Sequence, residues 1–428
     1  MTRTTTMTMT TRPSITAFSL GAACLMAACV QEQNLSDPQS LMSASDSGGS
    51  DESTGDVDDS ATSTTGQAPG CASNDGTLSS LDVHIGPGQS PMLYGISDVA
   101  IHPSGAIDIA FIQGEHIWAQ IDAAGMVSFG DPPGTLSHVG YVNAAADGRR
   151  LVGLEGWTAS DAGDWLQMIA ADGTIAWNAA VFEGGAYQNI PDEHLMLADG
   201  GALVHVFWVD DALHSRLIHF DSGGTVTAAD QNDSSDEALV DISLRDLVQA
   251  PNGDVWALRQ SGEVGRLDRY AAGTFDTPAQ SIEIPNRWVE QLRLDSEGRI
   301  VLLSGDPNYN QPFEPTTVRL EIRSAADGSV VAGLSSQDTE DFESPTAIAT
   351  GPCGEIFVAG SIGFDYTGWV ARVDEGGVLW SDTLDAQGAM FADVSQNGTL
   401  VVVGQTGVEV PDNVITATIA PYVARYEP

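Results

Sequence analysis

A pair of hairpins that recurs along the chain constrains the fold more than any other feature. Each unit opens with a short strand of alternating polar and apolar residues, turns at a glycine and continues into a second apolar strand. Asn-Gly and Asp-Gly dipeptides at these turns tolerate positive φ, which favours hairpins. The expected turn residues, spaced 43 to 56 residues apart, are Gly105, Gly148, Gly201, Gly253, Gly298, Gly354 and Gly398.

A second hairpin follows the first in most units. WAQIDAAGMVSF (118–129), WLQMIAADGTIAW (165–177) and WVARVDEGGVLW (369–380) share one plan, so the two tryptophans of the last stretch are expected to belong to the scaffold. Four short antiparallel strands per unit, repeated about seven times with no convincing amphipathic helix, predict an all-β protein with the β-propeller fold. The spacing of 56 residues between Gly298 and Gly354 leaves six or eight blades open.

The two ends of the repeat are expected to meet in one blade. The last unit ends at YVARYEP (422–428), which supplies a third strand without a fourth. Upstream of the first unit, NDGTLSSLDVHIG (74–86) has the pattern of a turn and a fourth strand. Pairing the two would cover exposed strand edges. We therefore expect an N-terminal strand to complete the last blade.

The first 70 residues follow a different plan. Basic residues precede a short apolar run, SITAFSLGAACLMAA (14–28), which predicts a signal peptide over residues 1–28. Residues 29–70 are rich in Ser, Thr, Gly and Asp and have almost no aliphatic side chains, so we expect a disordered acidic tether. The propeller is expected over residues 71–428.

The end of the apolar run resembles the lipobox of bacterial lipoproteins. Met26-Ala27-Ala28-Cys29 fits that motif, with methionine where the family usually has leucine. The resemblance implies lipidation of Cys29, with Cys24 as the weaker candidate and cleavage without lipidation as the alternative. The tether resembles those of myxobacterial lipoproteins. Together these features imply an exported protein, lipid-anchored to the cell envelope at the outer membrane or cell surface.

Residues 358–404 resemble the SBBP-type repeat of bacterial secreted seven-bladed propellers. The shared features are a Gly-Ser turn, the strand WVARVD and the strand GVLW. The close match covers the last two units, and it implies the same propeller fold for the chain.

Charge excludes one class of partner. The chain has 59 acidic residues against 16 arginines and no lysine, a net charge of −43 at pH 7. Such a surface repels polyphosphates, so we expect no nucleic-acid partner. Of the four cysteines, two lie in the expected signal region. The remaining two, Cys71 and Cys353, are expected to form one disulfide on the turn side of the ring, beside the closing blade.

Three connections between second and third strands are long, namely 155–164, 304–317 and 405–421. In a propeller they lie opposite the hairpin turns, where ligands usually bind. We expect ligand contacts there from Trp157, Asp161, Asp164, Asp306, Asn308, Tyr309, Asn310, Asp365 and Tyr366.

Metal ligation has two weak candidates. Asp306, Asn308 and Asn310 alternate as in a calcium loop, but Gln311 and Thr317 break that motif, so only a looser calcium contact stays open. His205 and His219 fall on neighbouring expected strands and are either metal ligands or structural histidines. No other cofactor is expected.

Catalytic motifs are missing from the sequence, including G-x-S-x-G, H-E-x-x-H and a phosphate-binding glycine loop, but the scattered ligands of a propeller enzyme would leave no such motif. From the anchor, the tether and the repeat we expect a monomeric, non-catalytic scaffold that binds a protein or glycan and contacts the membrane only through its N-terminal lipid. The alternative is a metal-dependent, lactonase-like hydrolase or lyase with its site at the channel mouth. A third interpretation is an envelope-assembly scaffold.

Overall fold

The structure is a computed structural model of the 428-residue chain. It describes residues 78–79, 96–102, 104–111, 118–130, 138–145, 147–155, 165–181, 190–209, 213–230, 243–261, 264–306, 317–335, 345–362, 367–395, 397–407 and 419–426. The chain divides into two units, 1–31 and 32–428, and every described residue belongs to the second. Among the described residues, no helix is long and apolar enough to cross a membrane.

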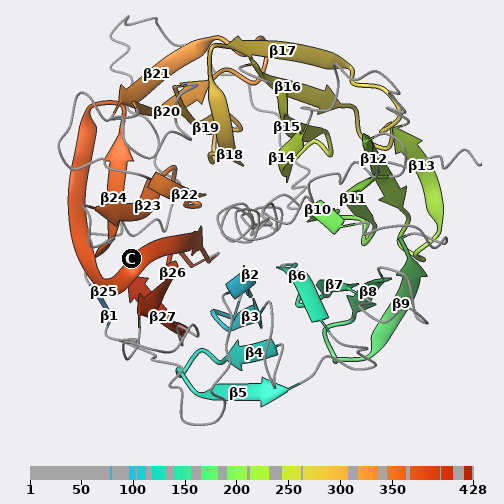
Figure 1. The fold of residues 1–428 in the computed structure, drawn as a ribbon, viewed down its shortest axis with the longest axis horizontal. Coiled ribbons are helices and arrows are strands. Elements are labelled where there is room, and N and C mark those ends of the chain that lie inside the picture. Colours follow the sequence, from blue (N-terminus) through green and yellow to red (C-terminus); the bar gives the residue numbers. More distant parts are fainter. Residues whose placement is uncertain are drawn as a thin grey trace, which may run out of the picture. The chain divides into compact units, whose positions relative to one another are not determined.

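The described strands form seven four-stranded antiparallel blades arranged in a ring (Figure 1). Blades one to three contain β2 (Ile96–Ile101), β3 (Ile107–Phe111), β4 (Trp118–Ile121), β5 (Val127–Gly130); β6 (His138–Ala144), β7 (Arg150–Glu155), β8 (Trp165–Ile169), β9 (Ile175–Ala180); and β10 (Ile190–Met196), β11 (Ala202–Val209), β12 (Leu213–Phe220), β13 (Val226–Asp230). Blades four and five contain β14 (Ser243–Gln249), β15 (Val255–Ser261), β16 (Val264–Tyr270), β17 (Gln280–Pro285); and β18 (Trp288–Leu294), β19 (Ile300–Gly305), β20 (Val318–Arg323), β21 (Val330–Ser335).

Blades six and seven share one long strand. They contain β22 (Pro345–Thr350), β23 (Ile356–Ile362), β24 (Thr367–Asp374), β25 (Gly377–Val394), β26 (Leu400–Gly407), β27 (Ile419–Tyr426) and β1 (Leu78–Ser79). The first part of β25 is the outer strand of blade six, and its last part is the innermost strand of blade seven. This sharing joins the two blades into one seven-stranded sheet and resolves the open blade number to seven.

The expected closure of the ring is confirmed. β1 pairs antiparallel with β27, with Leu78 opposite Tyr426 and Ser79 opposite Arg425, so an N-terminal strand completes the last blade. The Arg425 guanidinium then reaches blade one, where it donates to the carbonyl oxygens of Gly105 at 2.9 Å and Ala123 at 3.0 Å. Three hydrogen-bonded segments far apart in sequence therefore meet at the closure.

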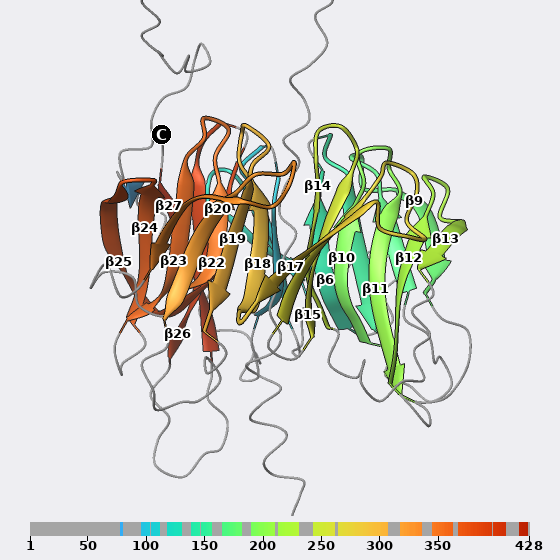
Figure 2. The same cartoon turned by 90° about the horizontal axis from the view of Figure 1, so that it is seen from above.

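Each blade has two distinct ends (Figure 2). At the turn side, tight hairpins join the first strand to the second and the third to the fourth. At the loop side, the second strand passes to the third, and the fourth passes to the next blade. The innermost strands are β2, β6, β10, β14, β18, β22 and the last part of β25, and each begins at the loop side.

The turns between first and second strands repeat one geometry. In each, the glycine N–H donates to the carbonyl oxygen three residues earlier, at 2.8–3.1 Å, and the glycine φ lies between 74° and 90°. In blade three this glycine is Gly200, so the expectation of Gly201 was wrong. Gly201 follows the turn and accepts a hydrogen bond from the Leu197 N–H at 2.9 Å. Among described non-glycine residues only Asn286 has positive φ, because a Cβ disfavours that conformation.

The hydrophobic core lies between neighbouring blades. For example, Trp369 of blade six is 1% exposed and packs in one cluster with Val301 and Leu303 of blade five. Trp380 lies 5.6 Å from Tyr426 and 6.1 Å from Phe357, measured between ring centroids. Both tryptophans of residues 369–380 are therefore packing residues of the scaffold, as the repeat predicted.

Candidate functional site

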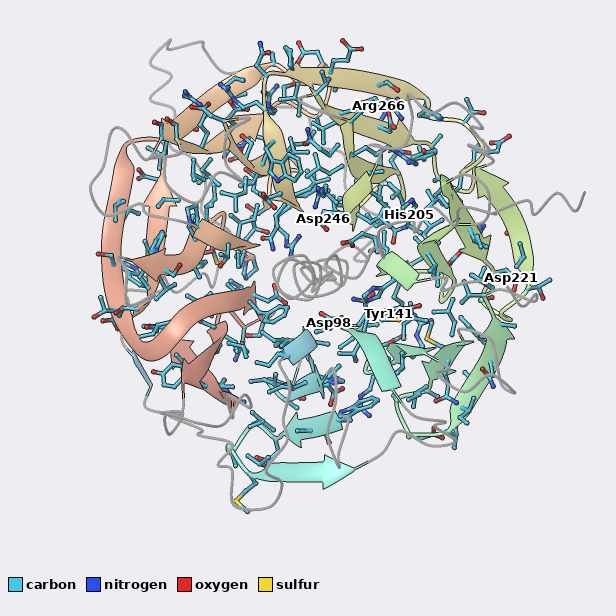
Figure 3. The ribbon with its side chains drawn as sticks, in the orientation of Figure 1. Asp98, Tyr141, His205, Asp221, Asp246 and Arg266 are labelled. Carbon is cyan, nitrogen blue, oxygen red and sulfur yellow. The ribbon has the colours of Figure 1, made fainter. Side chains whose placement is uncertain are left out.

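A β-bulge interrupts each innermost strand near the loop side. In all seven blades the pairing between the first and second strands shifts at this bulge. The residue that follows the shift occupies the equivalent position in each inner strand. These residues are Asp98, Tyr141, Glu193, Asp246, Gln291, Ala347 and Phe391. Figure 3 places Asp98, Tyr141 and Asp246 around the centre of the ring, whereas Asp221 lies at its outer edge.

Asp98 joins three blades. Its Oδ1 accepts the Val99 N–H at 2.8 Å, and its Oδ2 accepts the Val142 N–H of blade two at 2.7 Å. His194 Nε2 of blade three lies 3.4 Å from the same Oδ2, and its ring stacks on Tyr141 with centroids 3.8 Å apart. Burial raises the pKa of Asp98, and the His194 interaction and the N–H donors oppose that rise. We call Asp98 with these partners the Asp98 clasp.

Asp246 repeats this arrangement in blade four. Its Oδ1 accepts the Leu247 N–H at 2.8 Å, and its Oδ2 accepts the Leu292 N–H of blade five at 2.7 Å. Here the cation is Arg293, whose Nη1 lies 2.6 Å from Oδ2. Burial raises the pKa of Asp246 although Arg293 opposes it. Burial also raises the pKa of Asp393 in blade seven to about 8, again opposed by Arg293. We call this group the Asp246 clasp.

A neutral residue makes the same link between blades five and six. Gln291 Oε1 accepts the Ile348 N–H at 2.8 Å, from the position that Asp98 and Asp246 occupy in their own blades. Because an amide has no acid–base role, the link that Asp98, Asp246 and Gln291 make to the next blade does not require a carboxylate.

Asp108, a further buried aspartate, is also surrounded by donors. Trp118 Nε1 and Gln120 Nε2 donate to its Oδ1 at 3.2 and 2.9 Å. Arg150 Nε of the neighbouring blade lies 2.9 Å from its Oδ2, which also contacts His102. Buried carboxylates are stable when they are paired and hydrogen-bonded in this way. These acids therefore have clear structural roles.

A second set of polar residues lies at the loop side of blades four and five and is partly exposed. Arg245 and Glu290 are the extra residues of the bulges in β14 and β18, and Trp288 begins β18. The Arg245 Cζ lies 4.6 Å from the centroid of the Trp288 ring, and the Trp288 side chain hydrogen-bonds to Glu290. Burial raises the pKa of Glu290 to about 7, opposed by Arg245 and then by Trp288. Arg245 and Trp288 remain partly exposed. We call these three residues the Arg–Trp–Glu group.

Asp306 is the predicted ligand residue that the structure describes. It follows β19, and its Oδ1 lies 3.4 Å from Arg287 Nη1 and 3.7 Å from Arg319 Nε. Its backbone N–H donates to the Thr317 carbonyl oxygen at 3.0 Å. The carboxylate thus pairs with two arginines at the base of the 307–316 connection, on the loop side as predicted. A calcium contact here stays a prediction.

The other predicted ligand residues lie outside the described ranges, so their roles stay predictions. They are Trp157, Asp161, Asp164, Asn308, Tyr309, Asn310, Asp365 and Tyr366. Cys29 and Cys71 also lie outside them. Cys353 lies in the turn between β22 and β23 and is disulfide-bonded. Its pairing with Cys71 stays a prediction.

The two candidate histidines lie on one face of blade three, but diagonally. Leu203 is opposite His219, whereas His205 is opposite Leu217 on one side and Glu193 on the other. His219 Nδ1 lies 2.6 Å from the hydroxyl of Thr227, and burial lowers its pKa. In the part of the chain that the structure describes, no group of three or more His, Cys, Asp or Glu side chains could hold a metal ion.

The clasps and the Arg–Trp–Glu group were not predicted from the sequence. A signal existed in the aligned first strands SDVAI, RDLVQ and EQLRL, which place Asp98, Asp246 and Gln291 in register. A polar side chain recurring at one position of an otherwise apolar inner strand indicates a shared structural role.

Comparisons with known proteins agree with the fold. No protein-family model matches the chain, and no curated protein does. The WD40 repeats of RRP9 are similar at 12% identity and TM-score 0.51, covering 81% of this chain and 99% of that one. The structure of U3-55K is similar at 11% identity and TM-score 0.50, with the same coverage. A streptogramin B lyase structure has 11% identity, TM-score 0.49 and coverage of 81% and 97%. The chain is a seven-bladed β-propeller, and at these identities the similarity shows the fold alone.

Proposed function

We propose that this propeller is a non-catalytic binding scaffold that holds a protein or glycan partner on its loop side. The observation that carries the proposal is that the buried aspartates of the innermost strands bind backbone N–H groups. Both carboxylate oxygens of Asp98 and of Asp246 accept backbone N–H groups, one of them from the next blade. The amide of Gln291 makes the same interblade link without any acid–base capacity.

The binding surface that we assign includes the Arg–Trp–Glu group and the neighbouring Asp306. These residues lie where β14 and β18 begin and β19 ends, on the side where propellers usually bind ligands. A partly exposed tryptophan beside an arginine is typical of residues that dominate binding energy at interfaces.

We further propose that the protein is exported, lipidated at Cys29 and held at the cell envelope by the tether of residues 29–70. The lipobox-like motif and the acidic, aliphatic-poor tether support this location. Cys29→Ala should move the full chain from the membrane fraction to the soluble fraction and abolish acyl labelling. Unchanged fractionation and labelling would refute the anchor.

The test of binding uses the full chain immobilised against an envelope extract and a glycan array. Trp288→Ala should lose partner capture at a temperature where a cooperative melting transition shows that the variant is still folded. Met126→Ala is the matched control, because Met126 is 69% exposed and lies at the turn side. Capture that survives Trp288→Ala would refute the assignment of the surface.

A metal-dependent hydrolase or lyase remains the second candidate. Burial raises the pKa of Glu290 to about 7 and of Asp393 to about 8, and acids that titrate near neutral pH are common in active sites. Turnover of lactones or polysaccharides that EDTA abolishes, and that calcium or another divalent ion restores, would favour the enzyme over the scaffold.

A further inference from the structure

We propose that the Arg–Trp–Glu group is a subsite for a carboxylate-bearing sugar, such as the uronic acid unit of an acidic glycan. This inference rests on the proposed function, because it names the chemistry of the partner at the same surface.

The geometry of the group defines three recognition elements. The β-bulges bring Arg245 of β14 and Glu290 of β18 out of the regular ladder at equivalent positions of neighbouring blades. Trp288 lies between them, with Arg245 over its ring at 4.6 Å and its side chain hydrogen-bonded to Glu290. The aromatic ring is therefore held in place from two directions before any ligand binds.

Arg245 has unused hydrogen-bonding capacity. Its Nε is buried and has no hydrogen-bond partner among the described residues. A guanidinium presents five donors in a rigid fork that matches a carboxylate in two-point contact. Because Arg245 is partly exposed although its Nε is buried, a ligand carboxylate would meet the exposed part of the guanidinium and not the Nε.

The surrounding charge favours a single carboxylate. Residues 245–323 contain nine of the 16 arginines and 12 acidic residues, although the chain as a whole has a net charge of −43. Arg287 and Arg319 share the carboxylate of Asp306 beside the group. Blades four and five are thus far less negative than the rest, so they are where an anion meets the least repulsion.

The three elements together fit a sugar acid better than other anions. The indole offers an apolar surface to the C–H face of a sugar ring, and the Glu290 carboxyl can hydrogen-bond to a hydroxyl. Arg245 takes the carboxylate. A neutral sugar would offer Arg245 no carboxylate in addition to Glu290, and a polyphosphate would meet strong repulsion from the acidic surface.

The experiment measures binding to the full chain by isothermal titration calorimetry. The probes are a hexamer of galacturonic acid, its methyl ester and a hexamer of glutamate. We expect the acid to bind at least about tenfold more tightly than the ester, which corresponds to about 1.4 kcal/mol. Arg245→Gln should remove that difference, and Trp288→Ala should abolish binding of both sugars. Arg149→Gln is the matched control, because Arg149 lies at the turn side and pairs with Asp147.

The outcomes separate this inference from the proposed function. Arg245-dependent binding of the acidic sugar supports it. Binding of the glutamate peptide alone overturns the sugar assignment and favours an acidic protein partner. No binding of any probe, with Trp288-dependent capture of an envelope partner, also overturns it but leaves the scaffold function intact. No binding and no capture would refute both.

Discussion

The Asp98 and Asp246 clasps make the same backbone contacts but have different side-chain partners. In each, Oδ1 accepts the next N–H along the strand and Oδ2 accepts an N–H from the next blade, at 2.7–2.8 Å. Asp98 meets His194, two blades away, at 3.4 Å, whereas Asp246 meets Arg293 of the adjacent blade at 2.6 Å. The shared contacts are those that hold blades together. The side-chain partner differs between the two clasps, a histidine beside Asp98 and an arginine beside Asp246.

Removing the side-chain partners Arg293 and His194 should weaken the two clasps unequally. Arg293→Ala leaves Asp246 and Asp393 as buried acids without their cation, so we expect a loss of roughly 3–5 kcal/mol in unfolding free energy. His194→Ala should cost less, about 1–3 kcal/mol, because the longer contact contributes less. Urea unfolding at pH 7.5 measures both. Arg149→Ala is the control, because its partner Asp147 is 53% exposed, and it should cost about 0–1 kcal/mol. Equal losses for all three variants would contradict the distinction.

Asp393→Asn tests how the stability of the folded state depends on pH through a buried acid near Arg293. The folded-state pKa of Asp393 is about 8, against 3.8 for the ordinary carboxyl, so the folded state holds the proton more tightly. This acid therefore lowers stability progressively as pH rises from about 4 to about 8. The amide removes that loss. We expect no gain at pH 4 and a gain of about 2–4 kcal/mol above pH 8.

The control for this prediction is Asp172→Asn, because Asp172 lies on an exposed turn where hydrogen bonds from Thr174 lower its pKa. It should show no gain that grows with pH. A pH-independent effect of Asp393→Asn would contradict the account of its burial.

Substitution of Gln291, which makes the same interblade link without a charge, should have the smallest effect on stability. Gln291→Leu removes the acceptor for the Ile348 N–H and leaves that donor buried, so we expect a loss of about 1–2 kcal/mol. Guanidinium unfolding measures this loss. Gln291→Glu, which keeps a side-chain acceptor oxygen, is measured beside it for comparison. If Gln291→Leu were neutral, the clasp position would not hold blades together.

Local chemistry predicted the fold well. Alternating strands and turn glycines specify hairpins within about ten residues, and the orphan strand at each end predicted the pairing of β1 with β27. The one wrong turn residue was Gly201, although the Asp-Gly rule applied to Asp199-Gly200 selects Gly200, which has the positive φ. The clasps were not predicted because each links residues more than 40 positions apart, such as Asp98 and Val142, through contacts that exist only once the blades are packed. The same holds for Arg245 and Trp288.

The most direct test compares Asp98→Asn with Trp288→Ala in the same two assays, urea unfolding and partner capture by the full chain. We predict that Asp98→Asn lowers the unfolding free energy but retains capture at temperatures where it is folded. Trp288→Ala should lose capture even at temperatures where it is folded, because it removes a residue of the assigned binding surface. The opposite result, a stable Asp98→Asn variant that has lost function beside a functional Trp288→Ala variant, would contradict a structural role for the inner acids and place the site at the ring axis.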